Sequence, residues 1–342
     1  MTDLTEELRT RLDLLGDQIA ERHFARHPDQ LARYGAIGHQ RCREDARFHL
    51  QFLAAALDAK SDEMFLDYIA WAKVVLHARN VGEQDLHDNL SIVDEVLREQ
   101  FGPSEGTRLV RRAQEELPSM PLDVPTFLDP RSPQWQLATE YLGDLLRGNR
   151  REATKRILDA LEAGVTPRDL YVRVFEPVQQ EIGRLWQLNR VSVAQEHFCT
   201  AATQQVMTQL YSRIFTGEKH DRRVVAMAVG GEQHEVGIRI ITDLLELEGW
   251  QTWYLGANVP PRAAVAMCVE HRADVLLVSA TLPPHIAAAN EIIRLFHAEP
   301  ALANAKVIVG GRAFRMEPGL WSTIGADGYA ANADECIALV NG

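Results

Sequence analysis

The spacing of apolar residues changes near residue 222, and this change constrains the fold more than any other feature of the sequence. Upstream, apolar side chains recur every three or four residues, which is typical of helices that bury one face. Downstream they form short continuous runs separated by amphipathic helical stretches, which indicates a parallel sheet covered on both faces. The runs are 224–229, 252–255, 275–278 and 307–309, with a weaker fifth strand at 328–331. Residues 222–342 are therefore predicted to form a doubly wound α/β domain of the Rossmann or flavodoxin type, with its ligand beyond the carboxyl ends of the strands.

The helical part of the chain divides in two at a cluster of prolines. Pro118, Pro121, Pro125, Pro130 and Pro133 lie within a short span that neither a helix nor a sheet tolerates. We therefore expect a helical domain over 1–117, a linker over 118–133 and a second helical bundle of about four helices over 134–217. The predicted fold class is multidomain, α followed by α/β.

Composition excludes several classes of protein. The net charge of −12 argues against a broad nucleic-acid-binding face, which needs clustered Lys and Arg. The four cysteines are too scattered to suggest a zinc site or a disulfide framework. The apolar runs are too short to span a membrane, and the acidic N-terminus lacks the layout of a secretory signal. We expect a cytoplasmic protein that does not bind membranes or nucleic acid directly.

A histidine stands in the loop that follows the first predicted strand. Residues 230–237 read Gly-Gly-Glu-Gln-His-Glu-Val-Gly, so the Gly-x-Gly-x-x-Gly spacing of nucleotide-binding loops is absent. A single loop histidine is most often an exposed or capping residue. However, His234 lies two residues after Glu232, and a carboxylate on one ring nitrogen makes imidazole a better metal ligand. One such pair is too few for zinc but suits a metal that a macrocycle already holds.

Three motifs at three strand ends together resemble the B12-binding domain family, whose pattern is Asp-x-His-x-x-Gly, then Ser-x-Leu or Ser-x-Thr, then Gly-Gly. The matching residues are Glu232, His234 and Gly237, then Ser279 and Thr281, then Gly310 and Gly311. The resemblance implies that His234 is the lower axial ligand of cobalt, in place of the cofactor's dimethylbenzimidazole tail. Ser279 and Thr281 would line that tail, and the glycines would let it pass close to the backbone. Glu232 departs from the usual Asp, which leaves its contact with His234 less certain.

The second helical region resembles the cap of B12-dependent photoreceptors. Trp186 is followed, after nine residues, by Glu196 and His197, as in the group that binds 5'-deoxyadenosylcobalamin. The resemblance implies that all three border the adenosyl pocket. The chain departs from DNA-binding members at Gln187, where they carry a histidine that captures cobalt after photolysis. His197 is a candidate to replace it.

The first helical domain resembles the globin-like sensor domains of stressosome regulators, through segments around Arg43–Leu50 and Phe65–Lys73. Joined to a B12 unit, it resembles the photocobilins, which pair cobalamin with biliverdin. The resemblance implies a bilin whose propionates need cationic partners. Because the only N-terminal thiol is Cys42, non-covalent binding is expected. The candidate partners are Arg43, Arg47 and His49, together with Lys73, His77 and Arg79.

The favoured function is therefore a light sensor rather than an enzyme. It would bind adenosylcobalamin and biliverdin, form a homo-oligomer such as a dimer, and signal to a protein partner. Two alternatives remain open. A corrinoid methyl carrier would share His234 and the bundle but would not need Trp186 or the Glu196–His197 pair. A non-photochemical regulator that senses B12 or redox state would also bind cobalamin.

Overall fold

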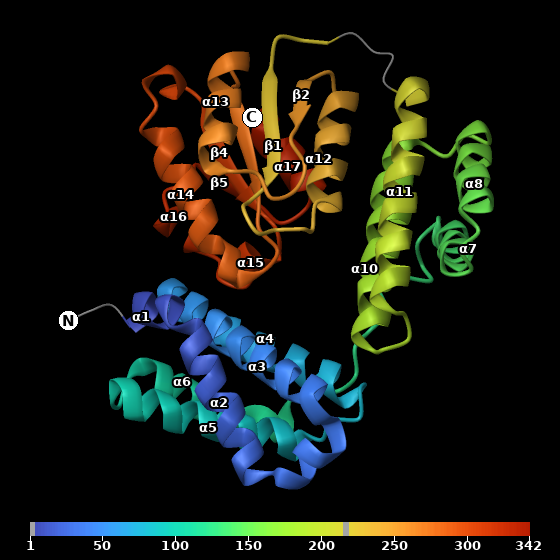
Figure 1. The fold of residues 1–342 in the computed structure, drawn as a ribbon. Coiled ribbons are helices and arrows are strands. Elements are labelled where there is room, and N and C mark those ends of the chain that lie inside the picture. The colour runs from blue at the N-terminus through green and yellow to red at the C-terminus, as the bar shows by residue number, and fades with distance from the viewer. Residues whose placement is uncertain (1–3, 215–218) are drawn as a thin grey trace. The chain divides into compact units, whose positions relative to one another are not determined.

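A computed structural model describes residues 4–214 and 219–342 of the chain. The chain divides into two compact units, residues 1–123 and residues 124–342, and each is treated by itself. The division falls inside the predicted linker. Figure 1 shows the elements of each unit along the chain. None of the described helices combines the length and the apolar character needed to cross a membrane.

The described part of the N-terminal unit is helical, as expected. Leu50, Leu53, Phe65 and Ile69 are fully buried in its core, at the helical spacing that the sequence shows. Gly102 ends α5 with a φ of 73°, a conformation that favours glycine. The elements are α1 (Leu4–Thr10), α2 (Leu12–Arg26), α3 (Pro28–Ala59), α4 (Asp62–His77), α5 (Glu83–Phe101), α6 (Glu105–Glu116) and a 3-10 turn (Leu117–Ser119).

The second unit begins with a helical cap. Thr166 starts one of its helices as predicted, because its hydroxyl accepts a hydrogen bond from the Asp169 amide at 3.1 Å and Pro167 occupies the first turn. A π-helical turn that the sequence does not announce follows directly, at Tyr171–Phe175. The predicted end of this region at 217 lies outside the described residues. The helices are α7 (Trp135–Leu146), α8 (Arg150–Glu162), α9 (Pro167–Leu170), α10 (Glu176–Gln187) and α11 (Val193–Ile214).

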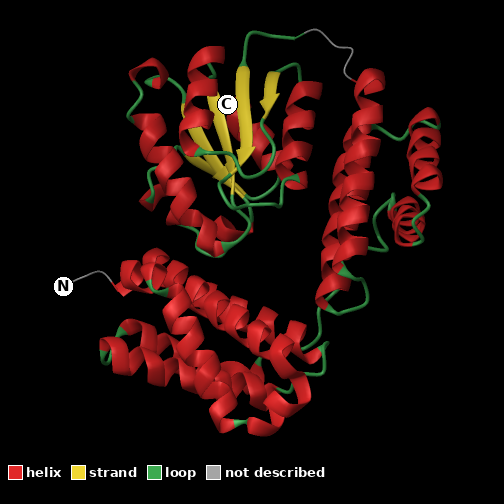
Figure 2. Ribbon diagram, viewed as in Figure 1, coloured by secondary structure: helices red, strands yellow, loops and turns green. Residues whose placement is uncertain are grey.

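The rest of the second unit is a five-stranded parallel sheet in the order β2-β1-β3-β4-β5, as the continuous apolar runs predict. Helices cover both faces (Figure 2). The chain leaves β1 toward β2 on one side and returns to β3 on the other, so the switch point lies between β1 and β3. The strands are β1 (Arg223–Ala228), β2 (Gln251–Tyr254), β3 (Val275–Ser279), β4 (Lys306–Gly310) and β5 (Gly328–Ala330). The helices are α12 (Val236–Leu247), α13 (Pro261–His271), α14 (Ile286–His297), α15 (Arg312–Arg315), α16 (Leu320–Thr323) and α17 (Ala333–Asn341).

Strand register brings the three sequence motifs to one edge of the sheet. Ala228 at the end of β1 pairs with Ser279, and Ser279 pairs with Gly310. The loops that follow these residues therefore emerge side by side at the switch point. The cap and the sheet share one continuous apolar core, and the buried Tyr171 of the π turn donates its hydroxyl to Asp243 of α12 at 2.8 Å.

Candidate functional site

Glu232 and His234 form a hydrogen-bonded pair in the loop between β1 and α12. The Nδ1 atom of His234 lies 2.5 Å from Oε1 of Glu232, whose side chain is fully buried, whereas the imidazole is 60% exposed. The hydrogen bond to Glu232 raises the pKa of His234, and the charges of Glu232 and Glu196 add to the shift. Because Glu232 accepts the Nδ1 proton, Nε2 is the nitrogen left for a metal.

Glu232 also binds the loop that follows β3. Its second oxygen, Oε2, accepts hydrogen bonds from the amides of Thr281 at 2.8 Å and Leu282 at 3.2 Å, and from Nδ1 of His285 at 2.9 Å. Burial alone would raise the pKa of Glu232, but the hydrogen bonds from His234 and His285 outweigh it and hold that pKa far below its usual range. Glu232 is therefore a carboxylate that joins two loops and fixes the imidazole.

The sequence interpretation missed His285. It lies in a 3-10 turn, Pro283–His285, and its Nε2 faces Gly231, where an added Cβ would lie 3.3 Å away. The only signal in the sequence is a histidine six residues after Ser279, at the same strand end. Among the described residues, no group of three or more His, Cys, Asp or Glu side chains could hold a free metal ion. The site therefore offers one ligand rather than a complete coordination sphere.

Replacing Glu232 with Gln is expected to weaken the site through both loops. The amide nitrogen of glutamine cannot accept the hydrogen bonds that one of the two carboxylate oxygens now accepts. The buried donors would lose their partner, and the apoprotein should lose about 2 kcal/mol of stability. Cobalamin affinity should fall by about 10-fold to 100-fold, as when the carboxylate partner of a ligating histidine is removed. Urea denaturation and equilibrium dialysis measure the two effects. Glu299→Gln, which alters a carboxylate that caps a distant 3-10 turn, is the control. Equal behaviour of the two variants would contradict this role of Glu232.

The glycines of the motifs have different surroundings. Gly311 has a φ of 98°, and a Cβ there would lie 2.3 Å from the carbonyl oxygen of Ala280. At Gly310 the added Cβ would lie 3.1 Å from the carbonyl oxygen of Ala330. At Gly237, in the first turn of α12, it would meet nothing within 4 Å. Gly311 is thus required by the packing of the loops, whereas Gly237 borders open space.

These features fit a cobalamin. The exposed Nε2 of His234 suits the lower face of a cobalt that already has its equatorial ligands, and the open space at Gly237 leaves room beside α12. Ser279 lies half-buried at the end of β3, and Thr281 lies in the loop that Glu232 holds through its amide. When bound, cobalamin would supply a redox-active cobalt that forms bonds to carbon.

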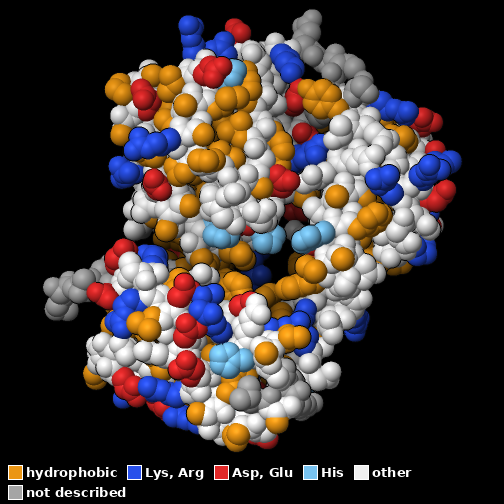
Figure 3. All heavy atoms as spheres, in the orientation of Figure 1, with side chains coloured by type: hydrophobic (Ala, Val, Ile, Leu, Met, Phe, Trp, Pro, Cys, Tyr) orange, Lys and Arg blue, Asp and Glu red, His pale blue; other side chains and the backbone are white. Residues whose placement is uncertain are grey.

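The cap carries a second carboxylate–histidine pair at the start of α11. The Glu196 carboxylate contacts Nδ1 of His197, whose side chain is 74% exposed. Glu196 lies close enough to contribute to the raised pKa of His234, after the larger effects of Glu232. In Figure 3, histidine side chains form a row that runs along the lower rim of the sheet domain toward the cap. Trp186 and Gln187 are half-buried at the end of α10.

The predicted bilin contacts lie in the N-terminal unit and are largely occupied. Arg43 donates to Asp17 at 3.0 Å, and Arg47 forms an ion pair with Asp13. Burial lowers the pKa of His49 to about 4, which disfavours the cationic form that a propionate partner would need.

Two other N-terminal groups are also constrained. Lys73 is 4% exposed and donates to the carbonyl oxygens of Leu117 at 2.7 Å and Met120 at 2.9 Å, so it holds the start of the linker. Burial raises the pKa of the Cys42 thiol to about 12, which disfavours the thiolate that a covalent bilin link would need.

His49 is expected to make the N-terminal unit sensitive to acid. Its folded pKa of about 4 lies below the ordinary histidine value of 6.5, so between these values the unfolded state binds more protons. Its contribution to stability is complete above pH 6.5 and falls by about 3 kcal/mol as the pH drops to 4. Denaturant unfolding of wild type and His49→Gln at pH 7 and pH 4.5 isolates this contribution. A difference between the two proteins that does not change with pH would refute it.

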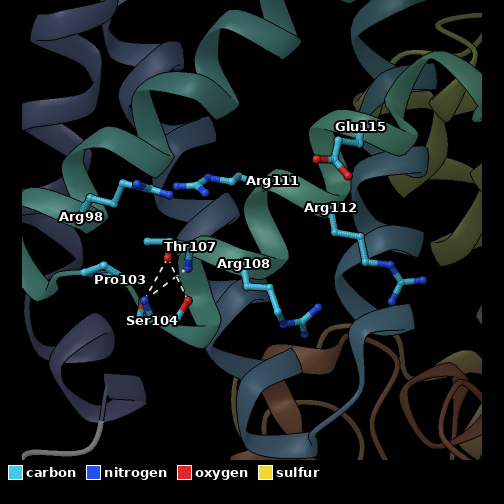
Figure 4. A pocket seen from close by; sticks show the side chains of 8 residues that line it. All are labelled: Arg98, Pro103, Ser104, Thr107, Arg108, Arg111, Arg112 and Glu115. Atoms are coloured by element: carbon cyan, nitrogen blue, oxygen red, sulfur yellow. Dashed lines mark hydrogen bonds between the residues drawn. The ribbon is translucent and has the colours of Figure 1, made fainter.

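An arginine-rich depression on the N-terminal unit contains none of the predicted bilin residues (Figure 4). Arg98 and Arg111 both donate through Nε to Asp94, at 3.1 Å each. Arg108 forms two hydrogen bonds with Asp62. Since carboxylates compensate these arginines, the depression is a weak candidate for an anion. Its lining is Arg98, Pro103, Ser104, Thr107, Arg108, Arg111, Arg112 and Glu115.

Comparison with known proteins identifies both domains of the second unit. Two family models, each described as a B12 binding domain, match residues 137–211 and 222–338, and together they match more than half of the chain. The HTH-type transcriptional repressor CarA of Myxococcus xanthus is 31% identical over 155 residues, 44% of this chain and 51% of CarA. The chain thus spans about half the length of that relative. Dimethylamine corrinoid protein 3 of Methanosarcina acetivorans is 26% identical over 189 residues, 54% of this chain and 87% of that protein.

A solved structure agrees with the fold. The monomethylamine corrinoid protein of Methanosarcina barkeri superposes with a TM-score of 0.54 at 20% identity, over 60% of this chain and 98% of that protein. The order of a helical cap followed by a parallel five-stranded sheet is therefore that of corrinoid proteins. Through residues 137–338, this chain belongs to the family of proteins that bind cobalamin with a paired helical cap and B12-binding domain.

Proposed function

We propose that the protein is a light sensor that binds adenosylcobalamin, with His234 as the lower ligand of cobalt. The observation that carries the proposal is the Glu196–His197 pair, which lies at the start of α11 near His234 and follows Trp186 at the spacing of B12-dependent photoreceptors. Adenosylcobalamin would supply a cobalt–carbon bond that visible light cleaves. The chain would supply the ligand His234, the carboxylate Glu232 and a cap that covers the upper face.

The N-terminal unit would bind biliverdin without a covalent link, with Arg43 and Arg47 as candidate partners of its propionates. Each arginine would then exchange an ion pair with Asp17 or Asp13 for one with the bilin. The proposed output is a change of assembly, such as that of a dimer, that a protein partner in the cytoplasm reads. Such a change requires an interface with two stable arrangements. The protein would not itself be an enzyme.

The test is an absorption spectrum of protein prepared in the dark with adenosylcobalamin and biliverdin, recorded before and after green light. Loss of the alkylcobalamin bands with a retained far-red bilin band is expected, together with a shift in size-exclusion volume. Trp186→Ala should alter the rate of bleaching, whereas Trp321→Ala, at a half-buried tryptophan in the short helix α16, should not. Bands that survive illumination would refute the light-sensing role.

A corrinoid methyl carrier is the second candidate, favoured by the similarity to dimethylamine corrinoid protein 3 over 87% of its length. A non-photochemical B12-sensing regulator is the third, favoured by the similarity to the repressor CarA. Indifference to adenosylcobalamin and biliverdin, with tight binding of methylcobalamin, would favour the carrier. Cobalamin binding without any effect of light, combined with binding to a regulatory protein, would favour the regulator.

A further inference from the structure

Glu235, the residue that follows the histidine ligand, occupies the N-cap position of α12 without capping the helix. N-cap carboxylates usually accept a hydrogen bond from the first turn. Here the side chain makes no such bond. Its carboxylate is instead directed toward α11 and β2, so the residue connects the start of α12 to these two elements.

Both oxygens of Glu235 have defined partners. Oε1 accepts a hydrogen bond from Nε2 of Gln204 in cap helix α11 at 2.8 Å, and Oε2 accepts one from the hydroxyl of Tyr254 in β2 at 2.9 Å. The backbone leaves room for this carboxylate at Gly256, which has a φ of 78° and where an added Cβ would lie 3.1 Å from Oε2. The sheet domain is therefore shaped around a residue that contacts the cap.

The contact at Gln204 is one of several polar contacts between α11 and α12. One turn further along, Arg239 donates to the hydroxyl of Thr208 at 2.9 Å. Further toward the ends of both helices, Tyr211 donates to Glu246 at 2.7 Å. These contacts keep the two helices in register, and Figure 1 shows them side by side. Only the first of them lies next to the loop that carries His234.

Helix α11 also connects the Glu196–His197 pair of the cap to the loop that carries His234. Glu196 and Gln204 are eight residues apart on one continuous helix, about 12 Å along its axis. Because a helix moves nearly as a rigid body, a displacement at Glu196 and His197 reaches Gln204. From Gln204 it passes through one hydrogen bond to Glu235, whose backbone nitrogen is bonded to His234.

We propose that Glu235 is a positioning residue that couples the histidine ligand of cobalt to the cap. The Gln204–Glu235 hydrogen bond holds the start of α12 against α11, and a cap that shifts along α12 changes the position of His234 through it. The inference rests on the cobalt ligation by His234 in the proposed function, but it does not require photochemistry.

The test uses the full chain with cob(II)alamin as the probe and electron paramagnetic resonance as the readout. A protein nitrogen on cobalt splits the spectrum, and labelling the protein with ¹⁵N changes that splitting, which separates His234 from the cofactor's own base. Glu235→Ala and Gln204→Ala should each reduce the nitrogen-ligated fraction and weaken binding by about tenfold. The double variant should lose no more than Glu235→Ala alone, because the contact that Gln204→Ala removes is already lost when Glu235 is replaced.

Two variants control for general damage. Glu235→Gln should behave like the wild type, because its amide oxygen can accept from Gln204 and its nitrogen can donate to Tyr254. Thr208→Ala removes a contact of the same interface away from the loop and should leave the nitrogen splitting unchanged. Thermal melts of the apoproteins show whether each variant is folded.

Splitting and affinity at wild-type levels in Glu235→Ala would overturn the proposal. So would a loss in Glu235→Ala that Gln204→Ala does not reproduce, because the coupling would then not pass through the cap. If the wild-type protein itself shows no splitting from a protein nitrogen, ligation by His234 is refuted and both proposals fall. Retained splitting in the wild type with unaffected variants refutes only the role of Glu235.

Discussion

The His234→Ala protein is expected to lose the protein nitrogen from bound cob(II)alamin and at least about 100-fold in cobalamin affinity. The estimate is a lower bound, because removing the carboxylate behind a ligating histidine already costs 10-fold to 100-fold. The change removes an imidazole that is 60% exposed, so the apoprotein should fold as the wild type does. The measurement is the paramagnetic resonance spectrum of ¹⁵N-labelled protein, with equilibrium dialysis for affinity.

His297→Ala is the matched control for this experiment. His297 belongs to the same domain and is also partly exposed, but it lies at the end of α14, where its ring contacts the carbonyl oxygen of Gly325. This variant should bind cobalamin as the wild type does. If the ¹⁵N splitting persists in His234→Ala, another side chain ligates cobalt, and the assignment is wrong.

Gly311→Ala is expected to destabilise the apoprotein by about 4 kcal/mol, a large fraction of the total stability of a typical domain. Alanine would have to adopt a φ of 98°, which L-residues rarely do, and its Cβ would lie 2.3 Å from the carbonyl oxygen of Ala280. Either the loop or β3 must therefore move. Because the contact is with backbone, no side-chain rotation relieves it. Urea denaturation of the apoprotein, or recovery of folded protein where the variant is too unstable, measures the effect.

Gly237→Ala provides the contrast. The added methyl group meets nothing within 4 Å, and alanine favours helix α12, whose second residue is Gly237, so apoprotein stability should be unchanged or rise by up to about 1 kcal/mol. Cobalamin affinity should nevertheless fall, because the methyl group enters the space assigned to the cofactor. Equal losses of stability in Gly311→Ala and Gly237→Ala would contradict the conclusion that Gly311 is crowded by backbone and Gly237 borders open space.

The sequence predicts the sheet domain well because its signals are local. The buried strands coincide with the continuous apolar runs, and the predicted weak strand at 328–331 is β5, Gly328–Ala330. The positions of His234, Ser279 and Gly311 at strand ends follow from the same runs, since parallel strands end at one edge.

Tertiary contacts explain what the sequence did not reveal. His285 is a site residue only because β1 and β3 pair and bring its loop to Glu232. The contact of Glu232 with His234, uncertain because glutamate is longer than aspartate, measures 2.5 Å. His49 resembles a surface cation in the sequence, yet the packing of α3 against Tyr68 buries it and makes it neutral. Each outcome depends on which distant residues meet, which periodicity does not encode.

The bonds of Glu232 also set an order of events during synthesis. Its partner His285 lies 53 residues further along the chain, so the carboxylate cannot be fully satisfied until that segment has left the ribosome and β3 has paired with β1. Contacts of such sequence separation form late in folding, because the intervening loop must first be closed. A nascent chain that ends before the second loop therefore has Glu232 beside His234 but lacks the three donors that hold the second oxygen of Glu232. The complete set of hydrogen bonds to Glu232 therefore requires most of the C-terminal domain.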